Sequence, residues 1–365
     1  MSFHIAGIGT SLPPFTADQK EAAQVAARFA HTDDRRARML RLLYRKSGVR
    51  TRRAVSLRGG DQPLEQRIPY YPLPKDESDL GPTTGDRMRW YAEQARPLAL
   101  RSAEAALDDA GLEAAAITHL VTVSCTGFDA PGVDAHLIEQ LGIPRGVART
   151  HVGFMGCHGA MNGLRVAGGY AGADPEARVL VNAVELCSLH FAYGWDEEML
   201  VANTLFADGS ASVVGHGGPD HGAADGWTIR AHGSFLMPES AEAMTWGIGD
   251  HGFRMTLSPR VPEAIGEYLP GWIEEWLGQH GLAPDDVVSW AVHPGGPRIL
   301  DAVRDSLRID ETELTISRET LRDHGNMSSP TVLFILERMR RENRPLPCVA
   351  LAFGPGLAVE AALVV

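Results

Sequence analysis

The sequence is short of cysteine, and the cysteines it has form no metal-binding or redox motif. Cys125, Cys157, Cys187 and Cys348 are widely spaced, and no two of them make a Cys-x-x-Cys pair. A zinc ribbon and a thioredoxin-like dithiol are therefore unsupported. Thiols distributed in this way are typical of the reduced state, so we expect a cytoplasmic protein.

Long apolar runs and an excess of basic charge are also missing. No stretch approaches the roughly 18 apolar residues that predict a transmembrane helix. The N-terminal sequence MSFHIAGIGTSLPPF lacks a basic start followed by a long apolar run, so we expect no signal peptide. The formal net charge of -12 disfavours general binding to nucleic acid or to an anionic membrane.

What the sequence does contain is an alternation of short apolar runs with amphipathic helical patterns, which predicts an α/β fold. Helical spacing of apolar residues predicts helices over Pro97–Gly111 and Thr331–Arg341, the second with Ser329 as its candidate N-cap. Strands are expected at Phe3–Ile8, His119–Ser124, Val179–Val184, Ala211–Val214, Trp227–Ala231, Val288–Val292 and Val349–Phe353.

Two stretches interrupt this alternation. Residues Ser56–Asp86 carry many prolines, glycines and charges without periodicity, which predicts a long surface loop. Residues Gly215–Asp225, GHGGPDHGAAD, form a second break near the middle of the chain. A chain of 365 residues is long enough for two domains or one duplicated unit, so we predict halves 1–220 and 221–365.

The first candidate site is a cysteine in a turn of small residues. Cys157 lies between Gly156 and His158 in GFMGCHGA, and a glycine-rich helical pattern follows it. Glycines permit a sharp turn and a close backbone approach. The start of a helix favours the thiolate, which is the nucleophilic form. The alternative is that Cys157 is a small buried hydrophobic residue in a tightly packed helix.

Two further segments carry polar residues at the joints between elements. His293 follows the apolar run VVSWAV and precedes PGGP, so it lies where a strand ends, the place at which α/β folds bind ligands. Asn326 lies in HGNMSSP, just before the helix over Thr331–Arg341. Each could be a simple turn residue. Together with Cys157, however, they form a Cys, His and Asn set suited to nucleophilic catalysis.

At this point the motifs resemble a family. GFMGCHGA, AVHPGGPRILD, HGNMSSPTVLFILERMR and AFGPGLAVE are similar, in this order, to four signature regions of the chalcone synthase-like type III polyketide synthases. The resemblance implies a thiolase fold of two duplicated αβαβα-type halves, the first with the cysteine and the second with the histidine and asparagine. It also implies a homodimer that uses malonyl-CoA and an acyl-CoA starter, with no metal and no redox cofactor.

The resemblance further implies roles for individual residues. Cys157 would hold the acyl chain, while His293 and Asn326 would stabilise the charge that develops when malonyl-CoA loses carbon dioxide. Phe206, in NTLFADGSASVV, would form an apolar wall where the CoA tunnel meets the cavity. Gly354, Pro355 and Gly356 would shape the cavity roof.

A dense basic stretch in an otherwise acidic chain points independently to CoA. Residues Arg35–Arg53 include nine basic side chains, which would attract phosphates or be a solvated helix face. The resemblance matches Lys46 to one of the family's CoA contacts. Two other contact positions match Met39 and Leu42, so we expect Arg38, Arg41 or Arg45 to take their place.

Three pocket positions depart from the plant pattern. Ala130 stands where a methionine is usual, His190 where a threonine helps to bind an aromatic starter, and Met255 where a second gatekeeper phenylalanine is expected. Ala130 would leave room at the cavity floor, which motivates a long fatty acyl starter and an alkylpyrone or alkylresorcinol product. His190 acts in the opposite direction, because a bulky polar side chain would shorten the cavity.

Other functions remain open from the sequence. A single-condensation enzyme like β-ketoacyl synthase III, supplied by an acyl carrier protein, would use the same three residues. A non-catalytic thiolase-fold protein that binds acyl-CoA would not need all three. A papain-like hydrolase also uses Cys, His and Asn, but the strand–helix alternation favours the thiolase pattern.

Overall fold

The computed structural model describes residues 2–218 and 226–365, and the predicted boundary between residues 220 and 221 lies outside them. Its main feature is a nine-stranded mixed sheet. From one edge to the other, the strands are β11 (Ser289–Val292), β12 (Cys348–Gly354), β13 (Ala358–Val364), β8 (Thr228–Leu236), β1 (Phe3–Ser11), β7 (Asp208–His216), β6 (Arg178–Leu186), β4 (His119–Ser124) and β5 (Ala148–Gly153).

The sheet consists of two halves with the same pairing pattern. In the N-terminal half, β1 and β7 are antiparallel, β7 and β6 are antiparallel, and β6 and β4 are parallel. In the C-terminal half, β8, β13, β12 and β11 repeat this order of orientations. Within the sheet, the halves join where Phe3 and His4 of β1 pair with Ile229 and Thr228 of β8. The topology therefore shows a duplication that no internal repeat in the sequence reveals.

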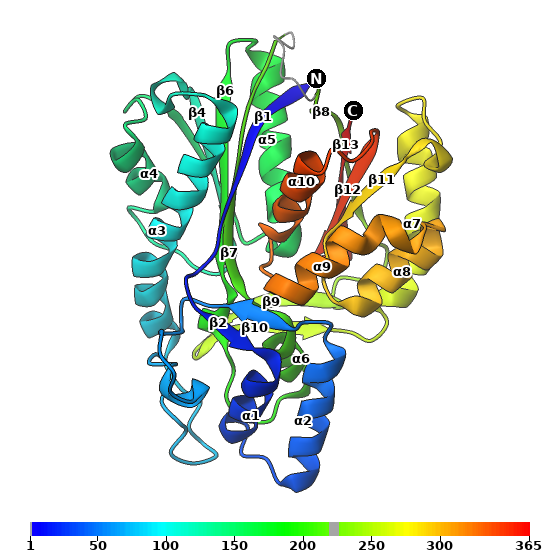
Figure 1. Cartoon of the computed structure of the whole chain (residues 1–365). Coiled ribbons are helices and arrows are strands. Elements are labelled where there is room, and N and C mark those ends of the chain that lie inside the picture. The colour runs from blue at the N-terminus through cyan, green and yellow to red at the C-terminus, as the bar shows by residue number, and fades with distance from the viewer. Residues whose placement is uncertain (1, 219–225) are drawn as a thin grey trace.

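Helices lie on both sides of each half-sheet (Figure 1). The helices α5 (Gly159–Ala173) and α10 (Thr331–Arg341) lie between the half-sheets, and their buried residues share one core with strands of both halves. The helices α3 (Thr84–Ala110) and α4 (Val133–Leu141) cover the outer face of one half, and α7 (Val261–Gly278) and α8 (Pro297–Leu307) cover that of the other. The predicted thiolase arrangement of αβαβα layers is confirmed.

All of the predicted strands are present, with small differences at their ends, and the helix over Thr331–Arg341 is α10. The helix predicted from Pro97 is longer, because Thr83 and Asp86 form a capping box that starts α3 at Thr84. The predicted cap at Ser329 is wrong: its hydroxyl donates instead to the buried carboxylate of Glu185 at 2.7 Å.

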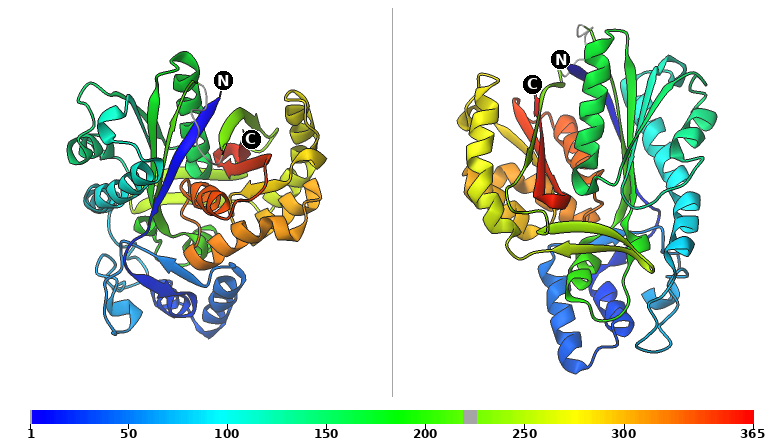
Figure 2. Two further views of the ribbon diagram at one scale, coloured as in Figure 1. Left: turned by 45° about the horizontal axis from the view of Figure 1, so that its top comes forward. Right: turned by 180° about the vertical axis from the view of Figure 1, so that it is seen from behind.

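A smaller layer lies across one end of the two halves (Figure 2). The hairpin of β9 and β10 passes beneath both half-sheets, and α1, α2 and α6 lie below it. These elements are β2 (Thr16–Asp18), α1 (Gln19–Phe29), α2 (Asp34–Lys46), β3 (Thr51–Arg53), α6 (Glu197–Leu205), β9 (Met244–Gly249) and β10 (Gly252–Leu257).

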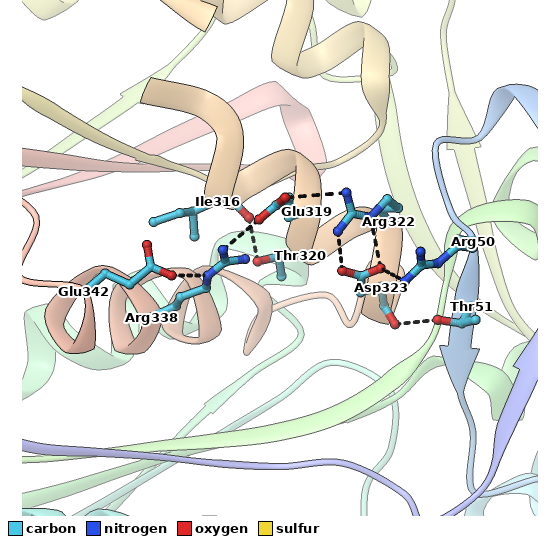
Figure 3. Close-up of polar contacts among 9 residues, drawn as sticks. All are labelled: Arg50, Thr51, Ile316, Glu319, Thr320, Arg322, Asp323, Arg338 and Glu342. Carbon is cyan, nitrogen blue, oxygen red and sulfur yellow. Dashed lines mark hydrogen bonds and ion pairs between the residues drawn. The ribbon is translucent and has the colours of Figure 1, made fainter. Parts of the chain in front are cut away.

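Polar contacts attach this layer to the C-terminal half at α9 (Thr315–His324), as Figure 3 shows. Arg50 forms an ion pair with Asp323 at 2.7 Å, and the hydroxyl of Thr51 donates to the Asp323 carbonyl at 2.8 Å. Arg322 and Arg338 extend the network along α9 and α10. Asp323 immediately precedes the loop that carries Asn326, so the network fixes one end of that loop.

No helix within the described residues is long and apolar enough to cross a membrane.

The contact between β1 and α3 gives a test of the fold. A Cβ atom at Gly9 would overlap the backbone of Ser102 and Ala106, which cannot move without displacing α3. We expect Gly9→Ala to lower the free energy of unfolding by about 3 kcal/mol or more, as overpacking of a rigid site does. Gly169→Ala is the matched control, because nothing lies within 4 Å of its Cβ position on the exposed side of α5.

The control is expected to be neutral or to stabilise by about 0.5–1 kcal/mol through its helix propensity. Urea titration of both variants measures the difference. Equal stability of Gly9→Ala and the parent protein would contradict the close packing of β1 on α3.

Candidate active site

Cys157 lies in the 3-10 turn Gly156–His158, directly before α5. Gly156 has a φ of 66°, a conformation that favours glycine, and a Cβ atom there would overlap the ring of Pro355. The cysteine turn of the N-terminal half is therefore packed closely against the Gly354–Gly356 segment of the C-terminal half. The candidate nucleophile lies at the junction between the two halves.

Asn326 is held rigidly beside this junction. Its backbone N–H donates to the Leu205 carbonyl, its carbonyl accepts from the Ala207 N–H, both at 2.9 Å, and its Oδ1 accepts from the Ser328 N–H at 2.8 Å. The side chains of Asn326 and Ser328 lie beside the thiol of Cys157, where both act to lower its pKa against the larger effect of burial. The structure thus brings together Cys157 and Asn326, which are far apart in the sequence.

His293 follows the end of β11 and is almost completely buried, with 1% of its surface exposed. Its backbone is fixed by a hydrogen bond from its N–H to the Leu351 carbonyl at 2.8 Å. Among the described residues, neither ring nitrogen has a hydrogen-bond partner. The ring of His158, the residue after Cys157, contributes to lowering the pKa of His293. A buried imidazole with two unpartnered nitrogens can accept a proton at one of them and donate a hydrogen bond to a substrate oxygen from the other.

Burial controls the ionisation of both groups. It raises the pKa of Cys157 to about 11, despite the hydrogen bonds from Ser328 and Asn326, and the nearby Glu185 raises it further. Burial also lowers the pKa of His293 to about 3. The expected preference for a thiolate at the helix start is thus outweighed by desolvation. Each group is neutral by itself, so a thiolate at this site needs a positively charged partner.

A cavity of about 30 Å³ lies in front of the thiol. Three of the predicted pocket residues line it: Phe206 at the end of α6, Met255 on β10 and Pro355. Gly354 and Gly356 flank Pro355, and a Cβ at Gly354 would overlap the imidazole of His158. Phe206 also forms a backbone bridge with Asn326, which fixes the apolar wall relative to the site.

The other two predicted pocket residues lie outside this cavity. Ala130 is exposed and lines a separate surface pocket of about 580 Å³, so within one chain it does not form the cavity floor. His190 is buried, bonded through Nε2 to the Thr126 carbonyl at 2.7 Å and through Nδ1 to the Phe253 N–H at 2.9 Å. Burial lowers its pKa to about 3, so the ring is neutral. His190 is thus a neutral ring held in place beside the site, where it lines a neighbouring cavity.

The predicted CoA-binding residues lie on α2. Arg38, Arg41 and Arg45 line a surface pocket of about 610 Å³, which can accept phosphate groups. Lys46 is exposed at the end of the same helix but does not line this pocket. Met39 and Leu42, at positions where the family has basic contacts, are exposed apolar side chains.

The sequence did not single out several residues around the thiol. Cys125, Cys187, Trp246 and Ser328 all line the cavity with Cys157. The carboxylate of Glu185 is completely buried behind them and accepts hydrogen bonds from the Cys125 N–H, the Thr126 hydroxyl and the Ser329 hydroxyl at 3.0, 2.6 and 2.7 Å. The signal for Glu185 was present in the sequence, because a carboxylate within the apolar run VLVNAVEL has to be satisfied internally.

Comparisons with known proteins cover the whole length of the chain. Residues 3–219 match the N-terminal domain of the chalcone and stilbene synthases, and residues 229–365 match their C-terminal domain. The chain is 34% identical to the 1,3,6,8-tetrahydroxynaphthalene synthase of Streptomyces peucetius, over 98% of this chain and 91% of that protein. It is 33% identical to an alpha-pyrone synthesis polyketide synthase-like protein of Mycobacterium tuberculosis, over 98% and 90% of the two chains.

Solved structures agree with these matches. The crystal structure of PKS-I from the brown alga Ectocarpus siliculosus superposes with a TM-score of 0.92 at 31% identity, covering 100% of this chain and 98% of that one. Both domain families and full-length relatives thus point to one assignment. The chain belongs to the chalcone and stilbene synthase family, the type III polyketide synthases.

Proposed function

We propose that this protein is an iterative condensing enzyme that extends an acyl starter with malonyl-CoA and cyclises the product to a pyrone, a resorcinol or a related aromatic compound. The observation that supports this most is the buried contact of Cys157 with Asn326, within a chain that has the family's two domains. The relatives named above make related products, as their names state.

The proposed cycle starts with the transfer of an acyl group from CoA to the sulfur of Cys157, which releases CoA as its thiol. Malonyl-CoA then loses carbon dioxide, and its thioester becomes an enolate. Asn326 and His293 stabilise the enolate oxygen by hydrogen bonds in a desolvated site, where such bonds are strong. The enolate carbon attacks the acyl carbonyl on Cys157. A carbon–carbon bond forms, the carbon–sulfur bond breaks, and the thiolate of Cys157 is regenerated for the next round.

His293 has a second proposed role in activating the thiol. Because both groups are buried and neutral by themselves, transfer of the proton from Cys157 to His293 creates two charges that stabilise each other. No other cationic group is needed for the thiolate. The unpartnered ring nitrogens of His293 suit this role.

The entrance is proposed to lie along α2. Arg38, Arg41, Arg45 and Lys46 would attract the CoA phosphates, while the pantetheine arm reaches Cys157 past Phe206. The exposed Met39 and Leu42 do not contribute charge, so phosphate binding depends on the arginines. Delivery by an acyl carrier protein remains the alternative.

We propose that the functional unit is a homodimer. The strand β5 forms one edge of the nine-stranded sheet, so only one of its sides pairs with another described strand. Several residues of β5 are exposed, and so are the nearby side chains of Phe128 and Met155. An unprotected edge of this kind is normally covered. The exposed segment with Ala130 lies on the same side, close to Phe128.

The function is tested by product analysis of purified enzyme with malonyl-CoA and a panel of acyl-CoA starters, beside the Cys157→Ala variant. Loss of the acyl acceptor is expected to reduce product formation by about a thousandfold or more, as for other nucleophiles. Mass spectrometry should show products lengthened by several two-carbon units. A product with a single added unit would favour the β-ketoacyl synthase III alternative, and no product from a folded enzyme would favour a non-catalytic role.

The proposed ion pair is tested by alkylation of Cys157 with iodoacetamide. With a pKa of about 11, about one thiol in ten thousand is ionised at pH 7, so rapid alkylation there requires His293. We expect His293→Gln to slow alkylation at pH 7 about tenfold or more, and the rate to recover only as the pH rises toward 11. His216→Gln, at the distant end of β7, is the matched control.

Peptide mass mapping identifies the modified cysteine in each variant. An alkylation rate and pH profile that His293→Gln leaves unchanged would contradict the ion pair.

A further inference from the structure

The proposed reaction consumes a proton in every round of extension. The malonyl carboxylate leaves as neutral carbon dioxide, and its negative charge ends on the sulfur of Cys157 when the carbon–sulfur bond breaks. In the next acyl transfer this charge passes to CoA, which leaves as a neutral thiol only if it gains a proton. In the proposed cycle His293 gives that proton, so His293 has to be protonated again once per round.

The source of this proton is not the catalytic pair itself. Cys157 is the group left ionised at the end of a round, so it cannot reprotonate its partner. His293 is 1% exposed, and neither of its ring nitrogens has a partner among the described residues. A further titratable group beside His293 would solve this problem, and the ring of His158 lies in a suitable place.

The inner face of the C-terminal half-sheet brings the two histidine rings together. Val292 pairs with Leu351, so His293 is next in register and lies beside Ala352 of β12. Ala352 and Gly354 face the same side of β12, because side chains alternate along a strand. A Cβ atom at Gly354 would overlap the ring of His158, at 2.8 Å from its Nε2.

The ring of His158 thus occupies the side-chain position of residue 354, diagonally across from His293. Side chains at diagonal positions on neighbouring strands are within reach of each other when they are aromatic or long. The effect of His158 on the pKa of His293 agrees with this proximity. His158 itself is almost fully buried, with 2% of its surface exposed.

One nitrogen of the His158 ring is fixed by a hydrogen bond. Its Nδ1 lies 2.7 Å from Oδ1 of Asn162, one helical turn further along α5. An amide oxygen can only accept, so Nδ1 carries the hydrogen. Nε2, which lies against Gly354, is therefore the nitrogen that can take up a proton and give it away.

Charged groups beyond Asn162 influence how readily His158 is protonated. Arg165 of α5 forms an ion pair with Glu360 of β13, and the Ser234 hydroxyl donates to the same carboxylate at 2.7 Å. Burial lowers the pKa of His158, the hydrogen bond to Asn162 and the charge of Glu360 raise it, and the charge of Arg165 lowers it again. The ring is therefore neutral at rest, with a carboxylate nearby that favours its cation.

This polar group also leads outward from the site. Glu360 is buried, whereas the side chain of Arg165 is 38% exposed and Ser234 is exposed. Water can therefore reach the end of the group that lies away from Cys157.

We propose that His158 is a proton relay that reprotonates His293 after each extension. The N–H bond at Nε2 of protonated His158 breaks, and an N–H bond forms on His293. The positive charge moves with the proton and pairs with the thiolate of Cys157, and His158 then takes a new proton from water. The inference rests on the proposed function and adds a residue that acts through His293, without contact with the reacting carbon atoms.

The test separates the first acyl transfer from the extensions. The first transfer uses the proton that the resting enzyme already holds, whereas each extension needs a new one. His158→Gln removes the proton-carrying ring but keeps a polar side chain. His232→Gln is the matched control, because His232 also packs against α5, near Gly168, and burial also lowers its pKa.

Loading is followed by intact-protein mass spectrometry with an acyl-CoA alone, and extension by the rate of product formation with malonyl-CoA in H₂O and in D₂O. We expect His158→Gln to slow extension about tenfold or more, as loss of a positioned proton donor does, while loading and iodoacetamide alkylation at pH 7 stay within about twofold. The solvent deuterium isotope effect on extension should increase, because proton delivery becomes the slow step. His232→Gln should leave all of these quantities unchanged.

Two results would overturn the inference. Equal slowing of loading, alkylation and extension would show that His158 only supports the structure of the site. An unchanged extension rate and isotope effect would show that water protonates His293 without His158. If His158→Gln does not fold by circular dichroism, Asn162→Leu replaces it, because it keeps the ring but removes the acceptor that orients it, and the same separation of loading from extension is expected. Failure of the proposed function itself is distinguishable, because then the parent enzyme forms no product.

Discussion

The position of Cys157 between the two halves is the constraint on which the rest of the site depends. The turn before α5 can bring the cysteine to this position only because Gly156 has a positive φ and no side chain to meet Pro355. The same close packing desolvates the thiol and raises its pKa to about 11. Desolvation strengthens each hydrogen bond made there, but it also removes the solvation that a thiolate needs.

The electrostatics of the site follow from this burial. Both Cys157 and His293 lose their charged forms when they are desolvated, and Glu185 behind the cavity adds to the cost of a thiolate. The carboxylate of Glu185 is itself balanced by several donors, so it can remain in the interior. In the proposed mechanism, the charge of Cys157 forms together with that of His293, and the reactivity of the thiol depends on this partner.

The sequence was a good guide to elements whose signals are local. The strands β1, β4, β6, β7, β8, β11 and β12 were predicted from apolar runs and α10 from its helical pattern, whereas β5, β9, β10 and β13 were not predicted. The motifs of Cys157 and Asn326 marked two segments that meet at the site. The position of Ala130 could not be predicted from local signals, because it depends on which surface its loop faces. The hydrogen bonds of His190 could not be predicted either, because they depend on backbone groups from distant segments. The positions of Ser328 and Trp246 likewise depend on tertiary packing, since these residues reach the cavity from distant segments.

The most direct measurement of the central claim is to trap the intermediate on the enzyme. The protein is mixed with octanoyl-CoA and malonyl-CoA, quenched in acid within the first turnovers, digested and analysed by peptide mass spectrometry. The account predicts that the peptide with Cys157 carries the octanoyl group and the same chain lengthened by two-carbon units, with Cys125, Cys187 and Cys348 unmodified. Acyl groups on another cysteine, or none on a peptide from enzyme that is forming product, would contradict it.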